Sequence, residues 1–152
     1  MNARLPMLVA IVAVLALVAG CGSGDDEGGS VEVTASSLSK PAFVKEASAI
    51  CERARGKLVA IKQPLPKAIP ATVLPAMESM VEEISELGAP SGDEAEVEAF
   101  LQAMQQETES LDEKQASISS FGKLEEEFKT SGGLAKKYGM PKCAFYARFS
   151  TS

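Results

Sequence analysis

Apolar residues recur at steps of three and four along much of the chain, which is the spacing of one face of an α-helix. This pattern predicts helices over about 41–62, 71–87 and 93–118. Its positions are Phe43, Ala47, Ile50, Ala54, Leu58 and Ile61 in the first helix, Val73, Met77, Met80, Ile84 and Leu87 in the second, and Val97, Leu101, Met104, Thr108, Leu111 and Ile118 in the third. No segment shows sustained alternation of apolar and polar residues, so we expect no sheet.

Prolines and capping residues predict where these helices begin and end. Pro64 and Pro66 should end the first helix, because a proline disfavours helical backbone in the residue before it. Pro75 should either begin or kink the second helix, since it has no backbone N–H to donate. Ser91 and Glu94 have the spacing of a capping box, in which each side chain binds a backbone N–H at the start of a helix.

A less regular segment follows the third helix. Apolar residues at helical steps predict a helix over about 121–130. Gly132 and Gly133 should interrupt it, which would leave one or two turns over 134–138. Short connections between consecutive helices favour antiparallel neighbours. We therefore expect an all-α domain over residues 41–149, an up-and-down four-helix bundle with three regular helices and an irregular fourth.

The first 20 residues have the features of an export signal. Arg4 precedes an unbroken apolar run over residues 7–19, and small residues follow that run. The run has 13 residues, whereas a comfortable bilayer span needs about 20. We therefore expect a signal peptide over residues 1–20 that is removed, rather than a retained transmembrane helix.

The signal ends in the motif Val18-Ala19-Gly20-Cys21. The motif resembles the lipobox of bacterial lipoproteins, although Val18 stands where leucine is commoner. The resemblance implies that diacylglycerol is attached to the sulfur of Cys21 and that a peptidase cleaves between Gly20 and Cys21. Each buried lipid CH₂ contributes about 0.8 kcal/mol, so two or three acyl chains would hold the protein at the outer face of the cytoplasmic membrane. An ordinary signal peptide followed by a chance cysteine is the alternative.

The segment after the lipobox has the composition of a linker. Gly, Ser and acidic residues dominate residues 22–39, so we expect a disordered tether. A flexible chain of that length spans about 23 Å on average. Residues 21–40 would therefore carry the lipid and hold the helical domain close to the membrane.

Cysteine pairing follows from the lipobox. If Cys21 carries lipid, Cys51 and Cys143 remain as an even set in an exported protein, and such cysteines usually form a disulfide. A bond between them would pin the C-terminal tail across the first helix. Two free thiols or a redox pair are the alternatives, although the chain has no C-x-x-C motif.

The mature chain has a cysteine in its first predicted helix and the run Tyr138-Gly139-Met140-Pro141-Lys142-Cys143 near its end. In these two features it resembles small uncharacterised exported lipoproteins of actinobacterial type. That resemblance implies no function.

The composition limits the chemistry that the chain can support. It contains no histidine, the commonest general base and metal ligand. The net charge of −6 argues against nucleic-acid binding. Met77, Met80 and Met104 lie on the apolar stripes, where methionine is usually core filler rather than a copper ligand. The glutamates between residues 78 and 86 lie off the stripe and should be solvated. We expect no catalytic residue, metal or cofactor.

Charge is unevenly distributed along the chain. Residues 40–67 hold seven basic and two acidic residues, residues 68–127 hold two basic and fifteen acidic residues, and residues 128–152 hold five basic residues and no acidic one. One interpretation is a basic surface that faces anionic lipid or an anionic envelope polymer. The other, which we favour, is that a basic first helix forms ion pairs with acidic neighbours.

These observations predict a lipid-anchored envelope protein with a non-catalytic helical interaction module for a protein or an anionic envelope component. The first alternative is a carrier of a small apolar ligand, which would need a void above roughly 300 Å³ between the helices. The second alternative is an enzyme, which would need polar side chains that converge in a cleft, and the apolar stripes indicate none.

Overall fold

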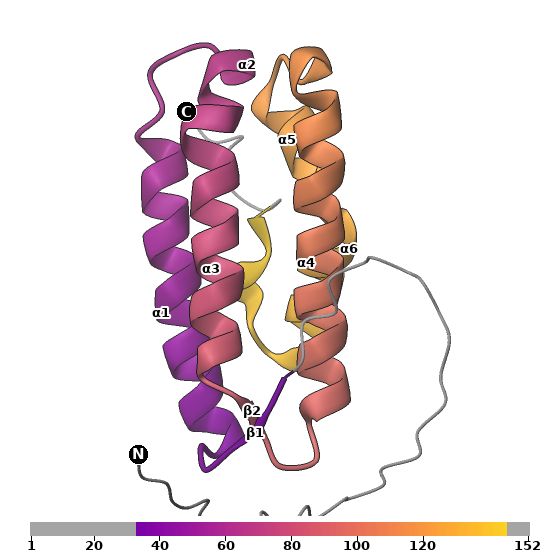
Figure 1. Cartoon of the computed structure of the whole chain (residues 1–152). Coiled ribbons are helices and arrows are strands. Elements are labelled where there is room, and N and C mark those ends of the chain that lie inside the picture. The colour runs from indigo at the N-terminus through magenta and orange to yellow at the C-terminus, as the bar shows by residue number, and fades with distance from the viewer. Residues whose placement is uncertain (1–32, 146–152) are drawn as a thin grey trace, which may run out of the picture.

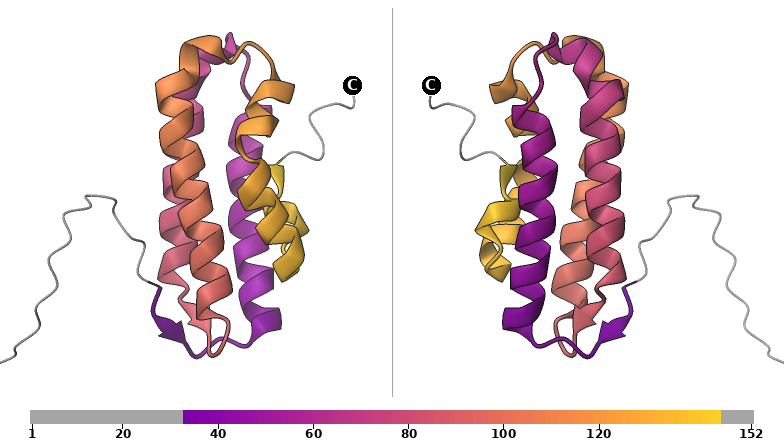
Figure 2. Two further views of the ribbon diagram at one scale, coloured as in Figure 1. Left: turned by 90° about the vertical axis from the view of Figure 1, so that its right-hand side faces the viewer. Right: turned by 90° about the vertical axis from the view of Figure 1, so that its left-hand side faces the viewer.

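Four long helices form most of the part of the chain that the structure, a computed structural model, describes, which is residues 33–145. They are α1 (Lys40–Val59), α3 (Leu74–Glu86), α4 (Glu94–Lys114) and α6 (Lys129–Tyr138). Consecutive helices run in opposite directions (Figure 1). Two further views place α3 and α4 on one side and α1 and α6 on the other (Figure 2). The predicted all-α, up-and-down bundle is confirmed.

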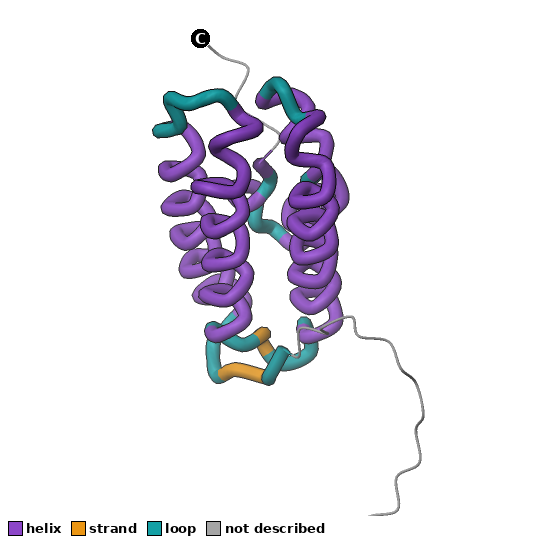
Figure 3. Tube along the Cα trace, turned by 45° about the horizontal axis from the view of Figure 1, so that its top comes forward, coloured by secondary structure: helices purple, strands orange, loops and turns teal. Residues whose placement is uncertain are grey.

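Short elements join these helices or flank them in the chain (Figure 3). They are β1 (Ala35–Ser36), α2 (Leu65–Ala68), the π-helical turn η1 (Ile69–Val73), β2 (Ala89–Pro90), the 3-10 turn η2 (Gln115–Ser117), α5 (Phe121–Glu127) and the 3-10 turn η3 (Pro141–Cys143). The end that carries β1 and β2 is called the base below. The C-terminal tail at η3 packs against both α1 and α6.

Most residues of the apolar stripes predicted from sequence form the core, although Ile61 and Leu87 are only partly buried and Phe100, which was not among the predicted positions, is fully buried. Met77, Met80 and Met104 are at most 1% exposed, which confirms them as core side chains. Fully burying a side chain of this size contributes about 1.5–3 kcal/mol. Across residues 33–145, every buried side-chain nitrogen and oxygen has a hydrogen-bond partner. The inner faces of the helices are therefore packed without polar groups left unsatisfied.

The second helical run begins earlier than predicted. α2, η1 and α3 follow one another without a break, so Pro66 lies in the first turn of a helix instead of ending one. Pro75 lies inside this run. Just before it, the N–H of Leu74 donates to the carbonyl of Ile69, five residues back. This wider turn makes room for Pro75, whose ring would clash with a carbonyl in a regular α-turn.

α6 corrects the prediction for the fourth segment. The break between helices falls at Phe128, and Gly132 and Gly133 lie inside α6. Each glycine in a helix costs about 0.5–1 kcal/mol relative to alanine. Contacts from elsewhere offset that cost, because the carboxylate of Glu107 on α4 accepts a hydrogen bond from the N–H of Thr130 at 2.7 Å. A side chain from another helix thus caps the start of α6.

The base contains a short sheet that the sequence did not predict. β1 pairs with β2 in parallel, with Ala35 opposite Ala89, and the N–H of Ala89 donates to the carbonyl of Thr34 at 2.9 Å. Val33 and Leu38 pack partly buried against the core. The last residues of the segment predicted to be a disordered tether are therefore structured. Two-residue strands are too short to produce a detectable alternation.

A polar cluster joins three helices at the base. The hydroxyl of Tyr138 donates to Asp93 Oδ2 at 2.8 Å, and Lys40 Nζ lies 3.2 Å from the same oxygen. Asp93 is the N-cap of α4, so the capping box predicted for Ser91 and Glu94 does not form. The hydrogen bond from Tyr138, and then Lys40, hold the pKa of Asp93 below its usual value.

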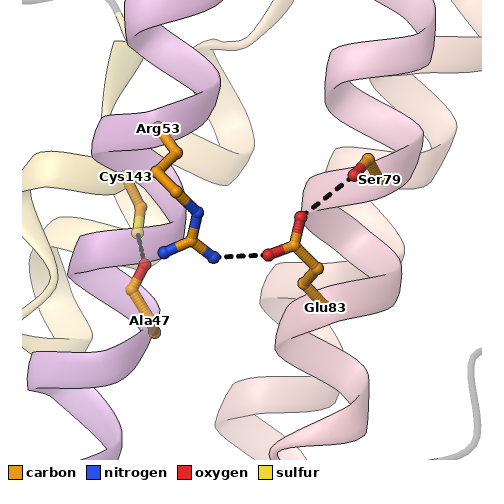
Figure 4. Close-up of polar contacts among 5 residues, drawn as sticks. All are labelled: Ala47, Arg53, Ser79, Glu83 and Cys143. Carbon is orange, nitrogen blue, oxygen red and sulfur yellow. Dashed lines mark hydrogen bonds and ion pairs between the residues drawn. The ribbon is translucent and has the colours of Figure 1, made fainter.

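The predicted disulfide is present. Cys51 in α1 and Cys143 in η3 are bonded at 2.08 Å across 92 positions of sequence, and both are fully buried. Sγ of Cys143 also lies 3.7 Å from the carbonyl oxygen of Ala47 (Figure 4). A disulfide sulfur has no hydrogen to donate, so this second contact is packing. The bond pins the C-terminal tail to α1, as predicted.

Candidate functional site

The residues predicted for lipid attachment and signal cleavage, Val18, Ala19, Gly20 and Cys21, lie outside the described residues. The lipobox therefore stays a prediction. Over residues 33–145, no helix is both long enough and apolar enough to span a bilayer.

A groove with a volume of about 490 Å³ lies on the bundle surface between α3 and α4. It is lined by Leu74, Glu78, Val81, Glu82, Ser85, Gln105, Thr108, Glu109 and Asp112. We call it the α3–α4 groove, and its four acidic residues the groove carboxylates. Both helices face the viewer in Figure 1.

Helical periodicity explains why these residues share one groove. Glu78 and Glu82 stand one turn apart on α3, and Glu109 and Asp112 stand about one turn apart on α4. α3 and α4 pack directly against each other, so the two acidic rows form opposite walls. Apolar side chains lie between them: Val81 is partly buried and Leu74 is 9% exposed.

The groove carboxylates form none of the four ion pairs found among residues 33–145. Two of them accept hydrogen bonds from neutral side chains: Glu109 accepts from Gln105 at 3.0 Å, and Asp112 accepts from Gln115 at 3.2 Å. Four negative charges thus face one hollow without a described cation beside them. This arrangement favours a positively charged occupant.

The side of α3 that faces α1 differs from the groove, because its acidic residue Glu83 forms an ion pair. Glu83 binds the guanidinium of Arg53 on α1 and accepts a hydrogen bond from Ser79 at 3.0 Å (Figure 4). Arg53 first, and then Ser79, hold the pKa of Glu83 below its usual value. Lys142 of η3 pairs similarly with Glu52 of α1 at 2.6 Å. The Arg53–Glu83 contact is the kind of ion pair expected between a basic first helix and an acidic neighbour, whereas Lys142–Glu52 joins a basic residue of the tail to an acidic residue of α1.

The polar cluster at the base is suited to holding helices together. Burial, followed by the hydrogen bond to Asp93, raises the pKa of the Tyr138 phenol above its usual value. A phenol that keeps its proton more firmly is a weaker acid and gives up that proton less readily. Its ring also lies 3.9 Å from Lys40 Nζ and stacks edge-on against Phe43. Each polar group of the cluster is thus engaged by another.

Metal binding finds no support in the described part of the chain. Residues 33–145 contain no group of three or more acidic or cysteine side chains arranged to hold an ion.

The α3–α4 groove differs from the void expected for an apolar-ligand carrier. It opens on the surface and has carboxylates on both walls, which a neutral apolar ligand would have to desolvate.

Sequence reasoning treated the glutamates of the second helix as solvated and did not predict a groove. The detectable signal was the presence of similar acidic pairs, one turn apart, on two consecutive helices. Which faces of the helices meet could not be read from either helix alone.

Comparison with known proteins does not add to this picture. No protein-family model matches the chain, and no curated protein or solved structure is significantly similar to it. The class that the fold defines is an all-α helical bundle with a disulfide-pinned C-terminal tail. Function must be inferred from the chain's own geometry.

Proposed function

We propose that this protein is a lipid-anchored envelope protein whose helical bundle binds another protein through the α3–α4 groove, without catalysis. The observation that carries the proposal is the groove itself, which combines an apolar floor with four carboxylates that form no described ion pair. Buried apolar surface supplies affinity in such a site, and charge supplies specificity and a faster association rate.

Two observations support an extracytoplasmic location. The motif Val18-Ala19-Gly20-Cys21 supplies a lipid anchor, and a disulfide such as Cys51–Cys143 is typical of oxidising compartments. The lipid would hold the domain on the outer face of the cytoplasmic membrane.

The position at which the described chain begins is consistent with a groove that lies on the side of the domain away from the lipid anchor. The described chain begins at Val33, beside the base. The groove residues of α4 all lie in its second half, which leads away from the base. The eleven residues between Cys21 and Val33 reach at most about 38 Å when extended. An anchored domain with its base toward the membrane would present the groove to a partner beyond it.

The anchor is tested by Cys21→Ser. We expect this variant to lose metabolic labelling with palmitate and to appear in the medium. Equal membrane retention of variant and wild type would refute lipid anchoring. Ser30→Ala is the control, because it changes one side chain of the same segment without touching Cys21 or the Cys51–Cys143 disulfide, and it should leave lipid labelling of Cys21 intact.

Binding is tested by placing a photo-crosslinking residue at Gln105, in the groove, and at Glu126, on α5 away from it. In intact cells we expect one discrete protein adduct from position 105 and none from position 126. Identical adduct patterns from both positions would contradict the groove as the interaction site.

A further inference from the structure

We propose that the occupant of the α3–α4 groove is an amphipathic helix of the partner protein, with Lys or Arg residues on both sides of a short apolar stripe. This inference rests on the proposed function, in which the groove is the interaction site, and it names the chemistry of the partner.

The shape of the groove fits the side chains of one helix face. A volume of about 490 Å³ is within the range of ligand sites, but it is too small to enclose a whole helix, whose diameter is about 10 Å. A helix that lies along the groove would insert only the residues of its apolar stripe, at steps of three and four. Val81 and Leu74 are the apolar side chains that such residues would meet.

The charges of the groove fit the flanks of the same helix. The acidic pairs on each wall are separated by about one helical turn, which is also the distance between residues i and i+4 of a bound helix. Lys or Arg residues on both flanks could therefore pair with both walls at once. An exposed pair contributes only about 0.2–1 kcal/mol, so the charges select the partner and the apolar stripe holds it.

Two other hollows on the described surface do not offer this combination. The hollow between α1 and α3 has a volume of about 160 Å³, and the Arg53–Glu83 pair lines it. The hollow at the end of α1 is lined by Lys57 and Lys62 and would repel a basic helix. Of these three hollows, the α3–α4 groove is the one whose charge is complementary to such a helix.

The test measures the dissociation constant of a fluorescent synthetic helix for the purified, full-length exported protein in neutral detergent. The probe carries leucines at helical steps of three and four, flanked by lysines. One control peptide replaces every lysine with glutamate, and another has the same composition in a scrambled order without an apolar stripe. We expect the basic amphipathic probe to bind at least about tenfold more tightly than either control, a difference of about 1.4 kcal/mol.

Charge reversal locates the binding site. The double variant Glu82→Lys/Glu109→Lys should weaken binding of the probe by at least about tenfold. The control variant Glu96→Lys/Glu126→Lys has the same net charge but alters residues outside the groove, and it should change the dissociation constant less than about twofold. Glu82→Gln/Glu109→Gln removes the same charges without adding positive ones, which keeps the test decisive if the lysine variant does not fold.

Three results would overturn the inference. Equal loss of affinity in the groove and control variants would indicate general electrostatic attraction. Equal binding of the scrambled peptide would show that the apolar stripe has no role. Absence of binding by the basic amphipathic probe, together with a discrete adduct from position 105 in cells, would leave the groove as the interaction site but exclude this occupant.

Discussion

Glu107 on α4 accepts a hydrogen bond from the backbone N–H of Thr130, in the first turn of α6, at 2.7 Å. The same carboxylate lies within 3.2 Å of the N–H of Ser131. Two N–H groups at the start of α6, which have no partner within their own helix, are thus satisfied by a residue more than twenty positions earlier. This contact helps to explain why a segment with two glycines is helical.

Glu107→Ala should lower the free energy of unfolding by about 1 kcal/mol, the usual cost of losing an N-terminal cap. Glu107→Gln keeps one acceptor oxygen and should cost less. Urea unfolding measures both, with Glu113→Ala as a control on the exposed surface of the same helix, where little change is expected. An alanine variant at 107 as stable as wild type would show that the cap is dispensable.

Gly133→Ala should stabilise the protein by about 0.5–1 kcal/mol, because the position is helical and a Cβ there would meet nothing within 4 Å. Gly139→Ala should do the opposite, since Gly139 ends α6 with φ of +100°, where alanine is strained. Thermal unfolding of the two variants should shift the midpoint in opposite directions. Shifts of the same sign would contradict the assigned backbone conformations.

Gly88→Ala should destabilise the protein more than Gly92→Ala. Both residues have positive φ, so both alanines are strained, but only at Gly88 would a Cβ lie 2.8 Å from the carbonyl oxygen of Thr34. The difference in unfolding free energy therefore reports the packing of β1 against the base. A repeat of the pair in a chain shortened to begin after Ser36 should make the two losses equal.

Replacing both Cys51 and Cys143 with alanine should destabilise the fold strongly. A disulfide that closes a loop of 92 residues is expected from chain entropy to raise the free energy of unfolding by about 4–5 kcal/mol. Measured gains for disulfides are typically about 2–4 kcal/mol. Urea unfolding measures the loss. Non-reducing mass spectrometry of the exported protein should find the two cysteines in one linked peptide pair, and two alkylatable thiols would disprove the bond.

Asp93 should contribute to acid sensitivity. Its pKa in the folded protein lies below its usual value of about 3.9, so its stabilising contribution is complete above that value and is lost as the pH falls through the folded pKa. The stability difference between wild type and Asp93→Asn should therefore shrink on acidification from about pH 6 to pH 3. Tyr138→Phe removes the hydrogen bond that lowers the pKa of Asp93 most, so the pKa of Asp93 should rise in this variant. Carbon NMR of the Asp93 carboxyl can follow that change.

Helix-period stripes determined much of the fold from the sequence. Residues such as Phe43, Met80 and Leu101 recur at steps that only a helix can place on one face, and all three are buried. The pairing of Cys51 with Cys143 followed from counting cysteines, once Cys21 was set aside for lipid. These inferences succeeded because they depend on local periodicity or on chemistry that does not require knowing which helices touch.

Other features were decided only when the helices packed. Gly132 and Gly133 predict a break by themselves, yet α6 continues through them, because Glu107 caps it and the Cys51–Cys143 bond holds the tail beside it. The groove carboxylates likewise look like ordinary solvated side chains along the sequence. The sequence alone determined most of the residues that are buried along α1, α3 and α4. Tertiary packing decided where α6 begins and which acidic rows face each other, because contacts between distant residues outweigh local preferences of about 1 kcal/mol.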